Sequence, residues 1–254
     1  MSSNTWTPGE LSSRARPVGG RCWRIVEAQH HASTMKITDT LEEQATIEAL
    51  IEETKPPIPV GCEKLDYLLM TPFRYSANNP TGTRFRRAYA ALGVFYAAGR
   101  SSTAVAEIVF YRLLFFAESP GTSWPQNPGE YTAFASDLDS KRLLDLTVSP
   151  FVGDGGLYHL VDYSVGQVIA DRAREADIEV LKYTSVRDPK SYPNFAILSP
   201  SAFARPEVVD RQSWKLHLDS KGARAFCELP HESLAFDRAT FTADPRMKNF
   251  VWDR

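Results

Sequence analysis

The chain has 254 residues, of which 43% are hydrophobic, and its formal net charge is −2. This length and apolar content suffice for a sizeable core in one large domain or two small ones. The near-neutral charge excludes a global basic field for nonspecific nucleic-acid binding, so any anion site has to be local. No apolar run approaches the roughly 18 residues that cross a bilayer, and no charged leader feeds an apolar stretch. We therefore expect a cytoplasmic protein that does not enter a membrane.

The cysteines and histidines show neither disulfide nor metal-ligand spacing. Cys22, Cys62 and Cys227 are odd in number, far apart and outside any C-x-x-C motif, which is typical of reduced thiols in a cytosolic protein. Of the five histidines only His30 and His31 are close in sequence, and adjacent histidines do not have the spacing of a zinc site. We expect no metal.

The N-terminal third is predicted to contain an arm, a strand and a helical insertion. Residues 1–20 are rich in Ser, Pro, Gly and Arg without periodicity, which is typical of a flexible arm. The apolar run Cys22–Val26 predicts a strand, and its Arg24 requires a partner, a cleft or an exposed face because burying a lone charge is costly. A capped helix is predicted over residues 41–55, with an apolar stripe that suits a packing role. We expect this helix in an insertion over about 38–70 of a single domain, residues 21–254.

The richest pattern lies between Pro72 and Arg112 and combines arginines, aromatic residues and one acid. Phe73-Arg74-Tyr75 precedes the strip TRFRR at 83–87, a predicted strand at 93–96 and a helix whose acid, Glu107, lies among apolar residues. A planar ligand with phosphates would use such a set, with guanidinium groups for phosphate, rings for stacking and a carboxylate for a sugar hydroxyl. The alternative is an ordinary solvated basic face with Glu107 placed for the helix dipole.

The second half of the chain predicts short strands with few helices. A glycine cluster at 153–156 lacks the strand-to-helix context of a dinucleotide-binding turn. A helix is predicted over 164–176, strands over 143–148, 178–183 and 194–198, and a hairpin from Trp214 to Leu229. Strands outnumber helices without a regular βαβ rhythm, which indicates the α+β class.

Six short motifs spread over most of the chain carry a family resemblance. They are Trp23-Arg24-Ile25-Val26, Pro72-Phe73-Arg74-Tyr75, Gly82-Thr83-Arg84-Phe85, Gly93-Val94-Phe95-Tyr96-Ala97, Thr103-Ala104-Val105-Ala106-Glu107 and Tyr183-Thr184-Ser185-Val186-Arg187-Asp188-Pro189. Together they resemble the RES-domain toxins, in the layout of ParT-type members. The resemblance implies a fold related to the ADP-ribosyltransferase toxins, with two small antiparallel sheets flanked by helices around an NAD cleft.

The resemblance also implies roles for particular residues. The catalytic residues would be Glu107, Arg24 and Ser185. The residues that bind NAD would be Arg24, Arg84, Tyr96, Glu107, Ser185, Arg74 and Tyr75. Arg24 would be the family's leading arginine, with Arg74 as the alternative. In this chain Gly-Thr-Arg-Phe-Arg stands where many members read Gly-Gly-Arg-Trp-Asn. Ser185 has a second interpretation from the residues alone, a serine turn that shapes the loop before Asp188-Pro189.

The implied activity is that of a toxin whose partner is an Xre-like antitoxin covering the active site. It would break the nicotinamide–ribose bond of NAD and transfer ADP-ribose to a cellular protein; the alternative is an NAD phosphorylase or glycohydrolase. Bond cleavage passes through an oxocarbenium-like transition state, which a carboxylate such as Glu107 stabilises. Two other classes remain open at this point: a nucleic-acid-binding module built on Arg84, Arg86 and Arg87, and an interaction protein whose basic strip docks an acidic antitoxin segment.

Overall fold

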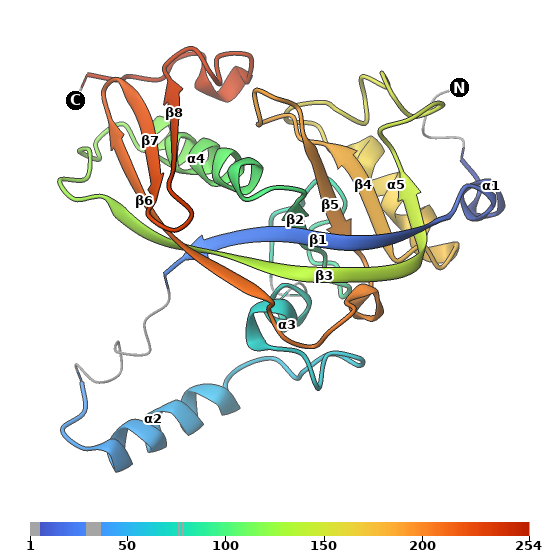
Figure 1. Cartoon of the computed structure of the whole chain (residues 1–254), viewed down its shortest axis with the longest axis horizontal. Coiled ribbons are helices and arrows are strands. Elements are labelled where there is room, and N and C mark those ends of the chain that lie inside the picture. The colour runs from blue at the N-terminus through green and yellow to red at the C-terminus, as the bar shows by residue number, and fades with distance from the viewer. Residues whose placement is uncertain (1–5, 29–36, 76, 78, 254) are drawn as a thin grey trace.

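The computed structural model describes residues 6–28, 37–75, 77 and 79–253, which form an α+β fold (Figure 1). The α-helices are α1 (Pro8–Ser13), α2 (Leu41–Glu53), α3 (Tyr67–Arg74), α4 (Ser101–Glu118) and α5 (Ser164–Glu175), and the 3-10 turns are η3 (Pro200–Ala202) and η4 (Pro245–Met247). The strands are β1 (Arg16–Glu27), β2 (Phe95–Ala98), β3 (Gly129–Asp145), β4 (Val180–Thr184), β5 (Pro193–Ile197), β6 (Asp210–Asp219), β7 (Gly222–Cys227) and β8 (Glu232–Asp237).

The strands join in a single sheet rather than in the two small sheets that were expected. Their order is β1-β2-β5-β4-β3-β6-β7-β8, and β1 also pairs with β3, so the first five strands close into a barrel. The strands form one sheet because of β3, which is 17 residues long. It pairs with β6 over residues 129–135, with β4 over 143–145, and with β1 along most of its length, as Figure 1 shows. One strand therefore connects the barrel to the β6–β8 extension.

Regular structure begins inside the stretch that composition assigned to a flexible arm. Thr7 and Glu10 form a reciprocal capping box on α1, which satisfies two of the free backbone donors at a helix start. Leu11 is fully buried, and the ring of the buried Trp6 lies 5.0 Å from that of Phe151. Composition averaged over residues 1–20 does not reveal two single buried residues such as these. The single domain over 21–254 stays a prediction.

Helix α2 does not have the packing role that its apolar stripe predicted. None of its residues is buried, and Leu41, Leu50 and Ile51 are exposed. Figure 1 shows it standing apart from the barrel. Its far end is tied down through Glu52, whose carboxylate is 2.6 Å from Nη1 of the buried Arg74 at the end of α3.

Helix α4 is the element that positions the site. Its buried residues are Thr103, Ala104, Val105, Ala106, Val109, Phe110, Leu113, Leu114 and Phe116. All of them except Thr103 and Ala104 pack with residues of β3 and of the β6–β8 extension in one apolar cluster, while α5 packs in a second cluster with β4 and β5. The first turns of α4 thus lie against the barrel with little freedom. No helix in the described ranges is long and apolar enough to span a membrane.

Candidate functional site

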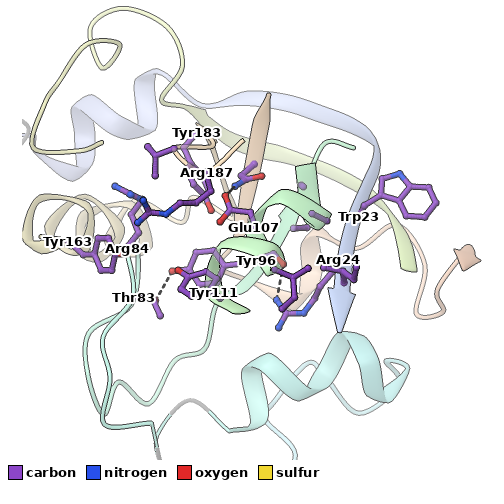
Figure 2. Close-up of a pocket in the computed structure, with 17 residues that line it drawn as sticks. Trp23, Arg24, Thr83, Arg84, Tyr96, Glu107, Tyr111, Tyr163, Tyr183 and Arg187 are labelled. Carbon is purple, nitrogen blue, oxygen red and sulfur yellow. Dashed lines mark hydrogen bonds between the residues drawn. The ribbon is translucent and has the colours of Figure 1, made fainter. Parts of the chain in front are cut away.

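A cavity of about 410 Å³ opens beside the start of α4 (Figure 2). It is lined by Trp23, Arg24, Ile25, Thr83, Arg84, Tyr96, Ala97, Ala98, Ala104, Glu107, Ile108, Tyr111, Tyr163, Tyr183, Val186, Arg187 and Asn194. Four of the residues singled out from the sequence, Arg24, Arg84, Tyr96 and Glu107, are therefore brought together although they come from four separate segments.

Glu107 lies in the second turn of α4 with one carboxylate oxygen held by two donors. Ser185 Oγ and Asn194 Nδ2 each donate to Glu107 Oε1, both at 2.7 Å. Hydrogen bonds to an ionised acceptor are shorter and stronger than neutral ones. The carboxylate is thereby fixed at the wall of the cavity.

Ser185 supports Glu107 and also shapes its own loop. Its Oγ accepts from the backbone N–H groups of Arg187 and Asp188, at 3.2 and 3.0 Å, while its proton goes to Glu107. Thr103 Oγ1 then donates to Asp188 Oδ2 at 2.7 Å, which ties this loop back to α4. The serine turn expected from the residues alone is therefore present, and the same hydroxyl also contacts Glu107. A direct contact of Ser185 with NAD stays a prediction.

Two arginines of the cavity have no acidic partner in the described part of the chain. Arg24 Nη1 donates to the Tyr96 carbonyl at 2.8 Å, and Arg84 Nη1 donates to the Leu157 carbonyl at 2.6 Å. Burial lowers the pKa of Arg24 to about 10, so it remains charged at neutral pH. Arg84 is buried, with its guanidinium 5.0 Å from the ring centre of Tyr163. Cations that lie at a cavity without an ion-pair partner of their own favour an anionic ligand.

The backbone around Arg84 is held by α5. Gly166 of α5 approaches so closely that a Cβ there would lie 2.3 Å from the Arg84 carbonyl oxygen, and only glycine permits such an approach. Gln167 Nε2 donates to the Thr83 carbonyl at 3.1 Å. Arg84 is therefore positioned by a helix that follows it by 80 residues in sequence.

The hydroxyl of Tyr96 binds the segment that carries Arg84. It lies 2.7 Å from Thr83 Oγ1 and accepts from the Phe85 N–H at 3.0 Å. Burial raises the pKa of Tyr96, so the phenol stays neutral. Its ring is part of the cavity lining, and the stacking role of Tyr96 stays a prediction.

Several lining residues were not singled out from the sequence. They are chiefly Tyr111, Tyr163, Tyr183, Arg187 and Asn194. The pKa of Tyr183 is raised well above its ordinary value, first by burial and second by the negative charge of Glu107. Arg187 forms an ion pair with Asp244 at 2.7 Å, and both side chains are almost fully buried. Arg187 and Tyr183 lie in a quoted motif, whereas nothing in the sequence links position 244 to this site.

Arg74 and Tyr75 lie outside the cavity lining. Arg74 Nε donates to the Pro56 carbonyl at 2.5 Å, and its Nη1 pairs with Glu52. The structure thus gives Arg74 a role in holding the insertion. Tyr75 is 37% exposed at the end of α3.

The strip at 83–87 is not an exposed basic face. Arg86 is buried and donates to the carbonyls of Thr81 and Arg87, whereas Arg87 pairs with Asp171 at 2.7 Å. This use of the arginines weakens the nucleic-acid interpretation, which needs free cations on one surface. Within the described ranges, no group of three or more His, Cys, Asp or Glu side chains is placed to hold a metal.

Comparison with known proteins identifies the family. The family model described as the RES domain matches residues 58–219, and the chain belongs to that family. The matched range includes Arg84, Tyr96, Glu107 and Ser185 and leaves Arg24 before its start. No curated protein matches the chain. Among solved structures, a crystal structure of the M. tuberculosis MbcT-MbcA toxin–antitoxin complex is similar at 12% sequence identity and a TM-score of 0.48, covering 80% of this chain and 89% of that one.

Proposed function

We propose that this RES-domain protein is the toxin of a toxin–antitoxin pair and that its cavity cleaves the nicotinamide–ribose bond of NAD. The observation that carries the proposal is the fixed carboxylate of Glu107 in a cavity shared with two arginines that lack acidic partners among the described residues. NAD offers the matching groups: a pyrophosphate for the arginines, ribose hydroxyls for the carboxylate and a flat ring for the tyrosines.

In the proposed reaction the bond between the anomeric carbon and the nicotinamide nitrogen breaks. Its electron pair leaves with the nicotinamide, which is cationic beforehand and becomes neutral, so no general acid is needed. Positive charge develops on the ribose in an oxocarbenium-like transition state. Glu107 stabilises that charge, and because Ser185 and Asn194 already hold the carboxylate, little reorganisation is needed as the charge appears.

Arg24 and Arg84 would hold the pyrophosphate, and Tyr96 would pack on the nicotinamide before it leaves. An acceptor then attacks the anomeric carbon. We propose a side chain of a cellular protein as this acceptor, which makes the chain a mono-ADP-ribosyltransferase. Phosphate or water as acceptor would use the same cavity and make it an NAD phosphorylase or glycohydrolase.

The proposed partner is an Xre-like antitoxin that covers the cavity. We expect an acidic or apolar antitoxin segment to reach the stretch between Arg84 and Tyr96 or the glycine loop near Gly155. Competition at the cavity predicts that added antitoxin raises the apparent KM for NAD or abolishes activity. Inhibition with unchanged NAD affinity would instead place the block on the acceptor side or at a distant site.

The direct test is to incubate the antitoxin-free protein with NAD and to measure free nicotinamide. Reactions with phosphate, without phosphate and with cell lysate separate the acceptors. Label from NAD on a lysate protein supports transfer, whereas ADP-ribose 1″-phosphate alone would contradict it. Running the assay at two salt concentrations with added nucleic acid tests the binding-module alternative, because phosphate-driven binding weakens steeply with salt. NAD left intact by a folded protein would end the enzyme proposal.

A further inference from the structure

Asn194 makes a contact with Glu107 that the sequence did not indicate. Its Nδ2 donates to Glu107 Oε1, the same oxygen that receives the proton of Ser185. No hydrogen bond to the other oxygen, Oε2, is made by any residue that the structure describes. Glu107 therefore has one oxygen committed to the protein and one left for a ligand.

The position of Asn194 is fixed from both sides. It lies in β5 of the closed barrel, where it faces Ala98 of β2 and Tyr183 of β4 in the two ladders. Its side chain is 3% exposed and lines the cavity. An ionised carboxylate can only accept hydrogen bonds, so the amide nitrogen has to face Glu107 and the amide oxygen has to face away.

That orientation of the amide is unfavourable for the amide oxygen of Asn194. Asn194 Oδ1 is buried and has no hydrogen-bond partner in the described ranges. Buried polar atoms are nearly always paired, and an unpaired one weakens the folded state. A leucine of similar size would avoid this penalty, so packing does not account for an amide here. The contact from Nδ2 to Glu107 does.

We propose that Asn194 is a second positioning residue for Glu107, acting with Ser185 to fix the carboxylate and to present Oε2 alone to the substrate. The proposal rests on the proposed function, because a positioning residue acts through the group that it holds. Two donors on one oxygen set both the distance and the plane of a carboxylate. Oε2 is then the atom of Glu107 that meets the ribose hydroxyls or the charge developing at the anomeric carbon.

The test compares two substitutions of Asn194 in the full chain. Asn194→Leu keeps the approximate shape and removes the donor. Asn194→Asp is nearly isosteric but replaces the donor by a second negative charge against Glu107. Gln212→Leu is the matched control, since Gln212 is a buried amide that accepts from Trp214 Nε1 at 3.1 Å and does not line the cavity. Thermal unfolding is followed for each variant, and nicotinamide release gives kcat and KM.

We expect Asn194→Leu to lower kcat by about 10- to 100-fold, the effect of losing one hydrogen bond to a charged group, with KM changed by less than about threefold. Asn194→Asp should lower kcat further, whereas Gln212→Leu should leave kcat unchanged. A packing role would reverse the first two, because the isosteric aspartate would then be the milder change. That reversal, or parental kcat in a folded Asn194→Leu variant, overturns the proposal.

A second measurement keeps this inference separate from the proposed function. The crystal structure of Asn194→Leu without ligand should show the Glu107 carboxylate rotated from its parental position on Ser185. If the parent releases no nicotinamide but Glu107 rotates in the variant, the NAD proposal fails and the positioning proposal stands. An unmoved Glu107 carboxylate would overturn the positioning proposal whatever the activity of the parent.

Discussion

Helices α2 and α4 differ in how they are capped and in how much of each is buried. Helix α2 has a complete capping box formed by Thr40 and Glu43, yet none of its residues is buried. Helix α4 has no side-chain cap at all, and nine of its 18 residues are buried. Caps and propensities can start a helix, but tertiary contacts fix where it lies. The helix without a side-chain cap is the one that holds the candidate catalytic carboxylate.

The largest expected effect separates chemistry from packing within α4. Glu107→Gln keeps the size and helix propensity of the side chain and removes its charge. We expect turnover to fall by about 10²–10³-fold, as for the loss of one well-placed electrostatic stabiliser. NAD binding should persist because the arginines are unchanged, and thermal unfolding should shift little. Parental turnover in a folded variant that binds NAD would show that Glu107 is only a surface or dipole residue.

The next effect tests the difference in burial directly. Leu113 of α4 is fully buried and Leu50 of α2 is 56% exposed. Leu113→Ala should reduce the free energy of unfolding by about 2–5 kcal/mol, and Leu50→Ala by less than about 0.5 kcal/mol. Chemical denaturation of both variants gives the two values. Equal losses would mean that α2 packs against the domain in solution.

A third prediction contrasts two buried arginines, one at the cavity and one at the insertion. Arg84→Ala should weaken NAD binding by about 1.5–3 kcal/mol, the contribution of a hydrogen bond to a charged group. Arg74→Ala should leave NAD affinity unchanged, because Arg74 bonds to Glu52 and Pro56 instead. Titration calorimetry measures both. If the two variants lose the same affinity, the assignment of Arg84 to the pyrophosphate is misplaced.

The smallest effect is confined to α2. Thr40→Ala removes the side-chain cap of α2 and should destabilise that helix by about 1 kcal/mol. Because α2 buries nothing, hydrogen exchange should speed up within residues 41–53 while global unfolding and turnover stay at the parental level. A matching loss of global stability would show that α2 and the barrel unfold together.

What the sequence predicted well are segments with strong local patterns. The helix α4 with Glu107, the helix α5 and the hairpin β6–β7 were all expected within a few residues of their observed bounds. The first part of β3 was missed. Asp137 and Asp139 interrupt its pattern and have low strand propensity, and the residues opposite them are Arg21 and Gly19 of β1. Pairing over such a sequence distance leaves no local trace.

The same limit applies to the candidate site. The family motifs indicated Glu107, Arg84 and Tyr96, which the cavity brings together. They favoured Arg24 as the leading arginine, but the 50 positions that separate it from Arg74 left Arg74 open as the alternative. The fold separates them: Arg24 lines the cavity, and Arg74 binds the insertion. Asn194 lies within a predicted strand, and only the closure of the barrel brings it to Glu107.

That closure has a consequence for the part of the chain that matches the family. Strand β1 ends at residue 27, whereas the match begins at residue 58. A fragment limited to residues 58–219 would lack β1 and leave the matching edges of β2 and β3 with unpaired N–H and C=O groups. Such edges pair readily with other chains, so this fragment should self-associate more readily than the whole chain.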